Sequence, residues 1–224
     1  SRPFQRAVGF IRLAFTFLRY GISLKGVDAI IMYSPPLPLA LIAIVLKKRH
    51  GAKFILNVQD LFPQNIIDLG LLKNPVAIAL CRIFERWVYR HADVITCHSH
   101  SNQQILQKTA QAGKPIHIVH NWIDVDNYRV TANGSIRSKT DTAKKFVAFF
   151  AGVMGFAQGL DVVMRAARLL KDEKDIVFLM VGDGVMKPQL QQLADGLSNV
   201  IFHPFVSLDD YPHWVAACDV GMVT

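Results

Sequence analysis

Short apolar runs alternate with helical patterns along almost the whole chain. Eight runs are expected to form strands, at residues 28–33, 53–58, 93–97, 116–119, 146–151, 176–181, 199–202 and 219–223. Helical periodicity occupies residues 4–20, 36–49, 75–91, 100–110, 159–172, 187–195 and 208–217. Several strand runs are unbroken enough to be buried on both faces of a sheet. Because such alternation demands parallel strands with right-handed crossovers, the sequence predicts an α/β fold with doubly wound sheets.

The helical pattern at 75–91 has the clearest boundary. Asn74 is a favourable N-cap, and Pro75 suits the first helical position. The apolar residues that recur at helical spacing are Leu80, Ile83, Phe84, Trp87 and Val88. The opposite side carries Arg82, Arg86 and Arg90, which is typical of a solvated face.

One polar segment interrupts the alternation. Between Asn121 and Lys145 the chain has no sustained apolar period, which indicates a connection between two domains. The predicted organisation is an N-terminal domain over 1–122, a connection over 123–145 and a C-terminal domain over 146–224. Since both flanking blocks are strand–helix arrays, we expect two Rossmann-like domains that face each other across a cleft.

The charge balance restricts the partners. The 224 residues include 25 Lys and Arg against 17 Asp and Glu, a net charge of +8. This excess is compatible with acidic small molecules, anionic membranes or nucleic acid. The basic residues are spread over several helices, with no groove-reading motif or aromatic RNA platform. The sequence therefore argues against nucleic acid as a partner.

Cysteine and histidine do not indicate a metal site. The three cysteines, Cys81, Cys97 and Cys218, lack metal or redox spacing, which favours a reducing compartment. The cluster Cys97–His100 contains zinc-ligand residue types, but on a strand successive side chains point to opposite faces. We expect no bound metal.

Two basic, apolar stretches bear on membrane contact. The opening helix carries Arg2, Arg6, Arg12 and Arg19 among apolar residues, and the apolar run 36–46 is followed by Lys47-Lys48-Arg49-His50. Eleven apolar residues are fewer than the roughly 20 of a spanning helix, and no signal peptide is recognisable. Two interpretations remain: helices buried in the fold with cationic ends, or an edge that lies on an anionic membrane.

A glycine-rich turn follows the strand at 146–151. It contains Gly152, Gly155 and Gly159 and leads into the next helix. Glycines at such a turn let the backbone approach a ligand, and the amides of the helix start attract an anion. The spacing G-x-x-G-x-x-x-G differs from the dinucleotide motif G-x-G-x-x-G. The turn thus indicates phosphate recognition without a dinucleotide cofactor, unless it is only a tight connection.

The motifs along the chain together resemble a known family. In chain order they are Ser34-Pro35-Pro36, Val58–Pro63, Val119–Asp124, Gly152 with Gln158-Gly159, Val181–Gly184, Asn199–Phe205 and Ala217–Gly221. This order is similar to that of the GT-B glycosyltransferases of the large retaining family four. With Gln rather than Lys at 158, the chain resembles the bacterial subgroup that builds O-antigen, capsule and colanic-acid-type exopolysaccharides.

The resemblance implies a retaining transferase that moves a sugar from a nucleotide-diphosphate sugar to a lipid-linked glycan acceptor. It implies a cytoplasmic location on the inner face of the membrane, without a metal or other cofactor. The implied donor-binding residues are Gly152, Gly155, Gln158, Gly159, Gly182, Gly184, Phe205 and Val206. The alternatives are a nucleotide-sugar epimerase of the same architecture and a non-catalytic nucleotide-binding fragment.

Asp60 is the candidate catalytic residue on the acceptor side. It follows the apolar strand 53–58 and precedes Leu61-Phe62-Pro63. Its carboxylate is expected either to bind or deprotonate an acceptor hydroxyl in the cleft, or to cap the next turn.

The family also has features that this sequence lacks. Family members open with a strand and a glycine-rich loop, and beyond the position of Asp219–Val223 they carry a Glu-x7-Glu loop that holds the donor sugar. Neither occurs here. The resemblance therefore implies a chain truncated at both ends, which we expect to be inactive by itself.

Overall fold

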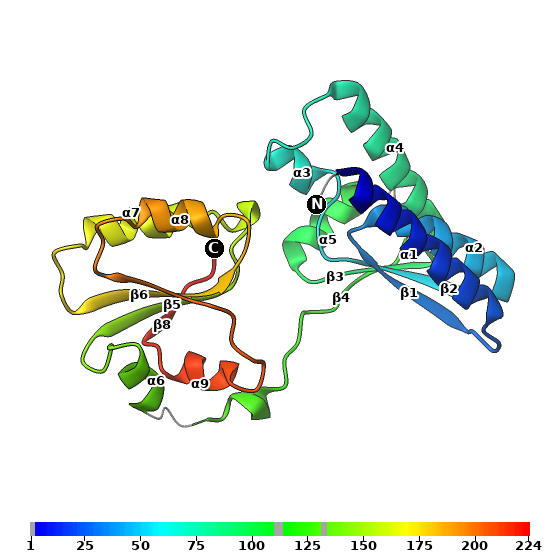
Figure 1. The fold of residues 1–224 in the computed structure, drawn as a ribbon. Coiled ribbons are helices and arrows are strands. Elements are labelled where there is room, and N and C mark those ends of the chain that lie inside the picture. Colours follow the sequence, from blue (N-terminus) through cyan, green and yellow to red (C-terminus); the bar gives the residue numbers. More distant parts are fainter. Residues whose placement is uncertain (1–2, 110–113, 131–133) are drawn as a thin grey trace. The chain divides into compact units, whose positions relative to one another are not determined.

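The chain divides into two compact units, Ser1–Trp122 and Ile123–Thr224. The computed structural model describes residues 3–109, 114–130 and 134–224; in the first helix it describes side chains only at residue 9 and from residue 11 onwards. In these parts of the chain each unit contains one parallel sheet of four strands (Figure 1). The α/β architecture predicted from the alternation is confirmed.

The first unit is built on strands in sequential order. The order β1-β2-β3-β4 is formed by Ala29–Ser34, Lys53–Val58, Val94–Cys97 and Ile116–Ile118. The helices are α1 (Pro3–Ser23), α2 (Ala40–His50), α3 (Gln64–Asp68), α4 (Pro75–His91) and α5 (His100–Thr109), with a short 3-10 turn over Leu37–Leu39. In the described residues, none of the helices combines the length and apolar character needed to cross a bilayer.

The strands of the first unit bury one face. Phe54, Leu56 and Val58 are fully buried in a cluster with residues of α2, α4 and α5. On the other face of the sheet Ile31 and Tyr33 are 63% and 61% exposed. A sequential order with right-handed crossovers sends the connecting helices to the same side, which explains this asymmetry among the described residues.

The second unit is doubly wound. Its strands lie in the order β7-β6-β5-β8, formed by Val200–His203, Ile176–Asp183, Phe146–Val153 and Val220–Gly221. The helices are α6 (Gly134–Lys139), α7 (Asp161–Leu169), α8 (Lys187–Leu193) and α9 (Tyr211–Ala216), with 3-10 turns over Val125–Tyr128 and Phe156–Gln158. Helices α7 and α8 cover one face of the sheet, and α6 and α9 cover the other (Figure 1). The direction in which strands are added reverses between β5 and β8, so the switch point of the sheet lies there.

The polar segment 123–145 lies in the second unit. It contains the helix α6, whose Ile136 is buried against β5 and α9. The neighbouring Arg137 donates to the carbonyl oxygens of Ala217 and Lys145, both at 2.9 Å. The bond to Ala217, 80 positions away, attaches the segment to the end of α9, whereas the bond to Lys145 lies within the segment.

In each sheet, an aspartate at the amino end joins two neighbouring strands. Asp93, just before β3, accepts the amide N–H of Phe54 at 2.7 Å and pairs with Lys47 at 2.8 Å. Asp219, just before β8, accepts the amide N–H of Val147 at 2.7 Å and pairs with Arg137 at 2.8 Å. Each carboxylate thereby joins its own strand to the neighbouring strand.

The helix α4 begins as predicted but buries only part of the predicted apolar set, namely Val88 and, in part, Phe84. Asn74 accepts from the amides of Val76 and Ala77, and Pro75 is the first helical residue. Of the set that recurs at helical spacing, Leu80, Ile83 and Trp87 are exposed. The buried side is formed by Glu85, Val88 and Tyr89. Hydropathy alone misassigned this face because a carboxyl group and a phenol share it.

Candidate functional site

A pocket lies at the switch point of the second sheet. It has a volume of about 400 Å³ and is lined by the carboxyl end of β5 and by the residues that follow β8. Its lining includes Phe149–Val153, Gln158, Tyr211, Val215, Cys218 and Gly221–Thr224. In open α/β sheets, ligands bind in the crevice at this place. The topology thus brings the predicted residues Gly152 and Gln158 to the position where a ligand is expected.

The glycine-rich turn is closed by Gln158. The backbone N–H of Gly155 donates to Oε1 of Gln158 at 3.1 Å, so this amide already has a partner. The side-chain NH₂ of Gln158 has no hydrogen-bond partner among the described residues, and Gln158 lines the pocket. The side chain therefore stabilises the turn through its oxygen and leaves its nitrogen free to donate to a ligand.

Gly159 joins the turn to α7. Its φ of +56° lies in the left-handed region, and a Cβ at this position would meet nothing within 4 Å. Helix α7 follows with Leu160 as N-cap, and no described side chain caps its first turn. The amides of Val162 and Val163 donate to the carbonyl oxygens of Gly159 and Leu160, both at 3.1 Å, so the attraction for an anion comes mainly from the helix dipole.

Close packing between the ends of β5 and β6 explains why Gly182 and Gly184 are glycines. A Cβ on Gly182 would overlap the carbonyl oxygen of Gly152, and a Cβ on Gly184 would overlap that of Met154. The two strand ends are further joined by the amide of Met154, which donates to the carbonyl of Asp183 at 2.8 Å. These glycines therefore hold the glycine-rich turn close to β6, whether or not a ligand touches them.

Lys187 was not among the predicted site residues. It begins α8, and its ammonium group donates to the carbonyl oxygen of Gly182 at 2.9 Å. It forms no ion pair with any described carboxylate. The feature of the sequence that could have identified Lys187 as a site residue is its position three residues after the turn Gly182-Asp183-Gly184. A cation is thus held beside the backbone that pairs with Gly152.

A smaller apolar hollow adjoins the pocket. It measures about 160 Å³ and is lined by Ala151, Gly152, Val181, Phe205, Val206, Leu208 and Tyr211. The predicted residues Phe205 and Val206 therefore share a hollow with Gly152. Apolar walls with a neighbouring tyrosine suit a flat ring.

In the first unit Asp60 lies at the carboxyl end of β2. It is exposed, and its carboxylate makes no hydrogen bond or ion pair with the described residues. The next helix, α3, has Pro63 as N-cap and receives no side-chain cap from described residues. Of the two expected roles, the cap of the next turn is therefore not observed.

Two histidines lie at the same end of this sheet. The register pairs Val58 with Cys97, which brings the chain after β2 beside His98. The Nδ1 atom of His98 is buried without a partner among the described residues. A ring nitrogen of His120 lies 2.9 Å from the carbonyl oxygen of His98. The prediction that residues Cys97–His100 lie on a strand, with successive side chains on opposite faces, is wrong beyond Cys97, because β3 ends there and α5 begins at His100.

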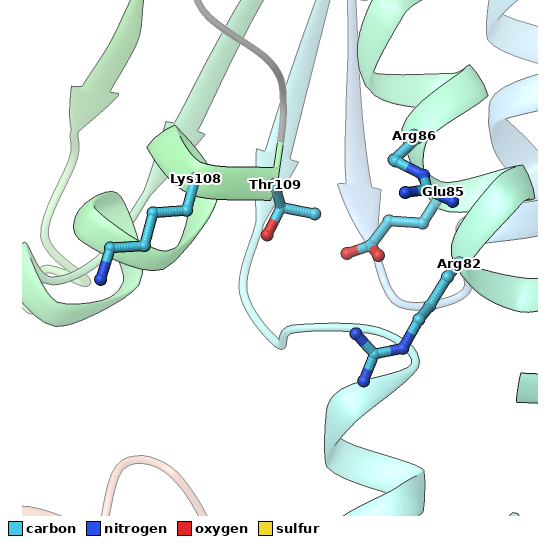
Figure 2. A pocket seen from close by; sticks show the side chains of 5 residues that line it. All are labelled: Arg82, Glu85, Arg86, Lys108 and Thr109. Atoms are coloured by element: carbon cyan, nitrogen blue, oxygen red, sulfur yellow. The ribbon is translucent and has the colours of Figure 1, made fainter. Parts of the chain in front are cut away.

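A further cavity lies between α4 and α5. It measures about 250 Å³ and is lined by Arg82, Glu85, Arg86, Lys108 and Thr109. Figure 2 shows the carboxylate of Glu85 pointing from α4 towards Thr109, with the guanidinium of Arg82 close by. Burial raises the pKa of Glu85, although its hydrogen bond with Tyr89 and the charges of Arg82 and Arg86 oppose this. None of the predicted site residues lines this cavity.

Family and sequence comparisons cover most of the chain. The sequence model of Glycosyltransferase Family 4 matches residues 1–127, and that of Glycosyl transferases group 1 matches residues 145–224. The probable glycosyltransferase WbjE of Pseudomonas aeruginosa is 25% identical over 231 residues, covering 100% of this chain and 57% of the relative. The putative colanic acid biosynthesis glycosyl transferase WcaI of Escherichia coli K12 is 29% identical over 188 residues, covering 80% and 46%. The chain spans about half the length of these curated relatives.

Several solved structures have a similar fold. HepE of Anabaena, in complex with UDP and glucose, has a TM-score of 0.71 at 17% identity and covers 95% of this chain and 56% of its own. Sucrose-phosphate synthase from Thermosynechococcus elongatus has a TM-score of 0.71 at 12% identity, covering 94% and 53%. At such identities the likeness concerns the fold alone.

Proposed function

Because the chain belongs to glycosyltransferase family 4, we propose that it transfers a sugar from a nucleotide-diphosphate sugar to a lipid-linked glycan in bacterial surface polysaccharide synthesis. Its fold is the GT-B fold of the solved relatives. The observation that carries the proposal is the pocket at the switch point, which adjoins both a glycine-rich turn and a helix start.

The first requirement of this reaction is a place for the leaving diphosphate. Negative charge develops on the diphosphate as the sugar departs, and pre-oriented donors lower the barrier. The start of α7 contributes the positive end of its helix dipole, and the NH₂ of Gln158 is a neutral donor; a hydrogen bond from a neutral N–H to a charged phosphate is worth about 1.5 kcal/mol. Lys187 lies beside the paired strand end and supplies the charge that Gln158 lacks. A charge-assisted contact is worth about 1.5–3 kcal/mol.

The nucleobase would occupy the apolar hollow next to the turn. Phe205 and Val206 border this hollow, and Gly152 belongs to both the hollow and the larger pocket. In a nucleoside diphosphate the base and the diphosphate are joined through the ribose, so they too need two neighbouring compartments. The HepE structures contain UDP or UDP-glucose, which supports this choice of ligand class for a chain of the same fold.

On the acceptor side, Asp60 is the residue that we assign to the reaction. Its exposed carboxylate is not engaged by the described residues, so it is available to bind or deprotonate a hydroxyl. We propose retention of configuration without a covalent enzyme nucleophile, and without a metal or other cofactor.

We further propose that the protein acts at the inner face of the cytoplasmic membrane. The described basic residues of α1 and α2 that remain available are Arg12, Arg19, Lys48 and Arg49. Lys47 is excluded from this role because it pairs with Asp93. Arg2 lies outside the described residues, as does the side chain of Arg6.

The proposal is tested by ligand competition and by transfer. UDP and GDP should compete for one site in the second unit, and an oligonucleotide should not displace them. In the longer protein that the resemblance implies, radiolabelled sugar from a nucleotide sugar should appear in a lipid-linked acceptor. An epimerase would instead convert the free nucleotide sugar without an acceptor. Absence of nucleotide binding, or displacement by the oligonucleotide, would contradict the assignment.

A further inference from the structure

The pocket at the switch point and the smaller apolar hollow meet at a tyrosine. The two spaces share three lining residues, Ala151, Gly152 and Tyr211. Ala151 has a methyl side chain and Gly152 has none, so Tyr211 is the one residue of the three whose side chain can form a hydrogen bond. A phenol therefore lies at the junction of the two spaces.

The ring of Tyr211 is held in position by the fold. The residue begins α9, and its amide donates to the carbonyl oxygen of Ser207 at 3.0 Å. The ring of Tyr128 contacts it edge-on with centroids 6.1 Å apart, and the buried ring of Phe149 lies 6.5 Å away. Such contacts between aromatic rings are favourable. Because the phenol is positioned before a ligand arrives, it loses less conformational entropy on binding.

The hydroxyl group of Tyr211 makes no hydrogen bond with the described residues of the chain. Burial raises the pKa of this phenol, and the neighbouring Tyr128 and Cys218 raise it further. The hydroxyl therefore stays protonated near neutral pH, where it can both donate and accept a hydrogen bond. A half-buried hydroxyl that the fold does not engage is available to a ligand.

The position of Tyr211 indicates which part of a nucleotide it meets. Gln158 borders the pocket but not the hollow, whereas Phe205 and Val206 border the hollow but not the pocket. Under the proposed function the diphosphate occupies the first space and the base the second. The unit that joins them is the ribose, whose hydroxyl groups both donate and accept hydrogen bonds. The junction is thus the place for the ribose.

We propose that Tyr211 binds a ribose hydroxyl of the donor nucleotide through its phenol oxygen and thereby favours ribonucleotides over nucleotides that lack the ribose hydroxyls. This inference rests on the proposed function and adds a specificity-determining residue to the donor site. A site that hydrogen-bonds a ligand hydroxyl rejects the analogue without it, because the polar group of the site is then left unpaired.

A Tyr211→Phe variant tests the contact, because phenylalanine keeps the ring and removes only the hydroxyl. In titration calorimetry on the 224-residue chain, this variant should bind UDP about fivefold more weakly than the unaltered protein, which corresponds to one neutral hydrogen bond. Its affinity for 2′,3′-dideoxy-UDP should equal that of the unaltered protein, since this analogue lacks the hydroxyls. GDP and its dideoxy analogue give the same comparison for a purine.

Tyr128→Phe is the matched control. Tyr128 is the tyrosine next to Tyr211, and it lines neither the pocket nor the hollow. Its variant should bind UDP and the dideoxy analogue as the unaltered protein does. If Tyr211→Phe lost affinity equally for UDP and the dideoxy analogue, the hydroxyl would act only through the fold, and the inference would be overturned.

Failure of the proposed function gives a different result from failure of this contact. If neither UDP nor GDP binds to the unaltered chain, the proposed function and the role of Tyr211 are both contradicted. If UDP binds and Tyr211→Phe binds it equally well, only the role of Tyr211 is contradicted, and the donor site stands.

Discussion

Gly159 offers the sharpest test of the donor site, because the chain contains a matched position. Gly159 and Gly196 have φ of +56° and +73°, and at neither would an added Cβ meet an atom within 4 Å. A residue with a Cβ pays about 1–2 kcal/mol in this left-handed conformation. Gly159→Val and Gly196→Val should therefore lose similar amounts of unfolding free energy. Only Gly159 adjoins the pocket, since Gly196 precedes the amino end of β7.

Nucleotide affinity should separate the two variants. A valine at 159 would occupy the space where the diphosphate meets the start of α7. Losing two charge-assisted hydrogen bonds of about 1.5 kcal/mol each corresponds to about a 100-fold weaker UDP affinity, measured by titration calorimetry. Gly196→Val should bind UDP as the unaltered protein does. Unchanged UDP affinity in both variants would refute the site, and an equal loss in both would indicate damage to the fold instead.

Substitutions at three further positions probe other contacts of the fold and the donor site. Lys187→Gln should weaken UDP binding about tenfold in calorimetry and leave uridine binding unchanged, while Lys187→Arg keeps most of the UDP affinity; an equal loss for uridine would mean a purely structural role. Gly182→Ala should lower the free energy of unfolding by about 1–3 kcal/mol in urea titrations, because its Cβ overlaps the carbonyl of Gly152; a change within error would show that the strand ends can separate. Burial raises the pKa of Asp93, but hydrogen bonds from Lys47 and the Phe54 amide outweigh it and lower the pKa below its usual range. The pKa of Asp219 is lowered by the hydrogen bond from the Val147 amide and, after it, by Arg137. Their contribution is complete above the unfolded value of about 3.9 and is lost as the pH falls through the depressed folded values, so Asp219→Asn should flatten the decline of the urea midpoint between pH 5 and pH 3.

The strands were predictable because their signal is local. The apolar runs at 53–58 and 146–151 coincide with β2 and with most of β5, and Asn74-Pro75 marks the start of α4. Each of these elements is specified by neighbours in sequence. The GT-B fold followed from the order of such elements and motifs, and the solved relatives share it.

The buried side of α4 was not predictable from hydropathy. Glu85 and Tyr89 are polar by residue type, yet they share a hydrogen bond and are 6% and 1% exposed. Burial raises the pKa of Tyr89 strongly, and the nearby carboxyl of Glu85 adds to this effect. A polar pair that satisfies itself can be buried at moderate cost, and it then displaces apolar residues to the surface. Leu80, Ile83 and Trp87 accordingly lie on the exposed side of α4.

The position of the donor site depends on a contact that sequence patterns do not contain. Strand β8 could pair with either edge of the sheet, and only pairing with β5 creates the switch point. Asp219 stabilises the pairing of β8 with β5 at the amino end of the strands, because its carboxylate accepts the N–H of Val147 in β5 and pairs with Arg137. Arg137 lies 82 positions away, in the polar segment that lacks an apolar period. That segment therefore contributes the cation that places β8 beside β5, and the crevice that would receive the nucleotide sugar opens at the other end of the same two strands.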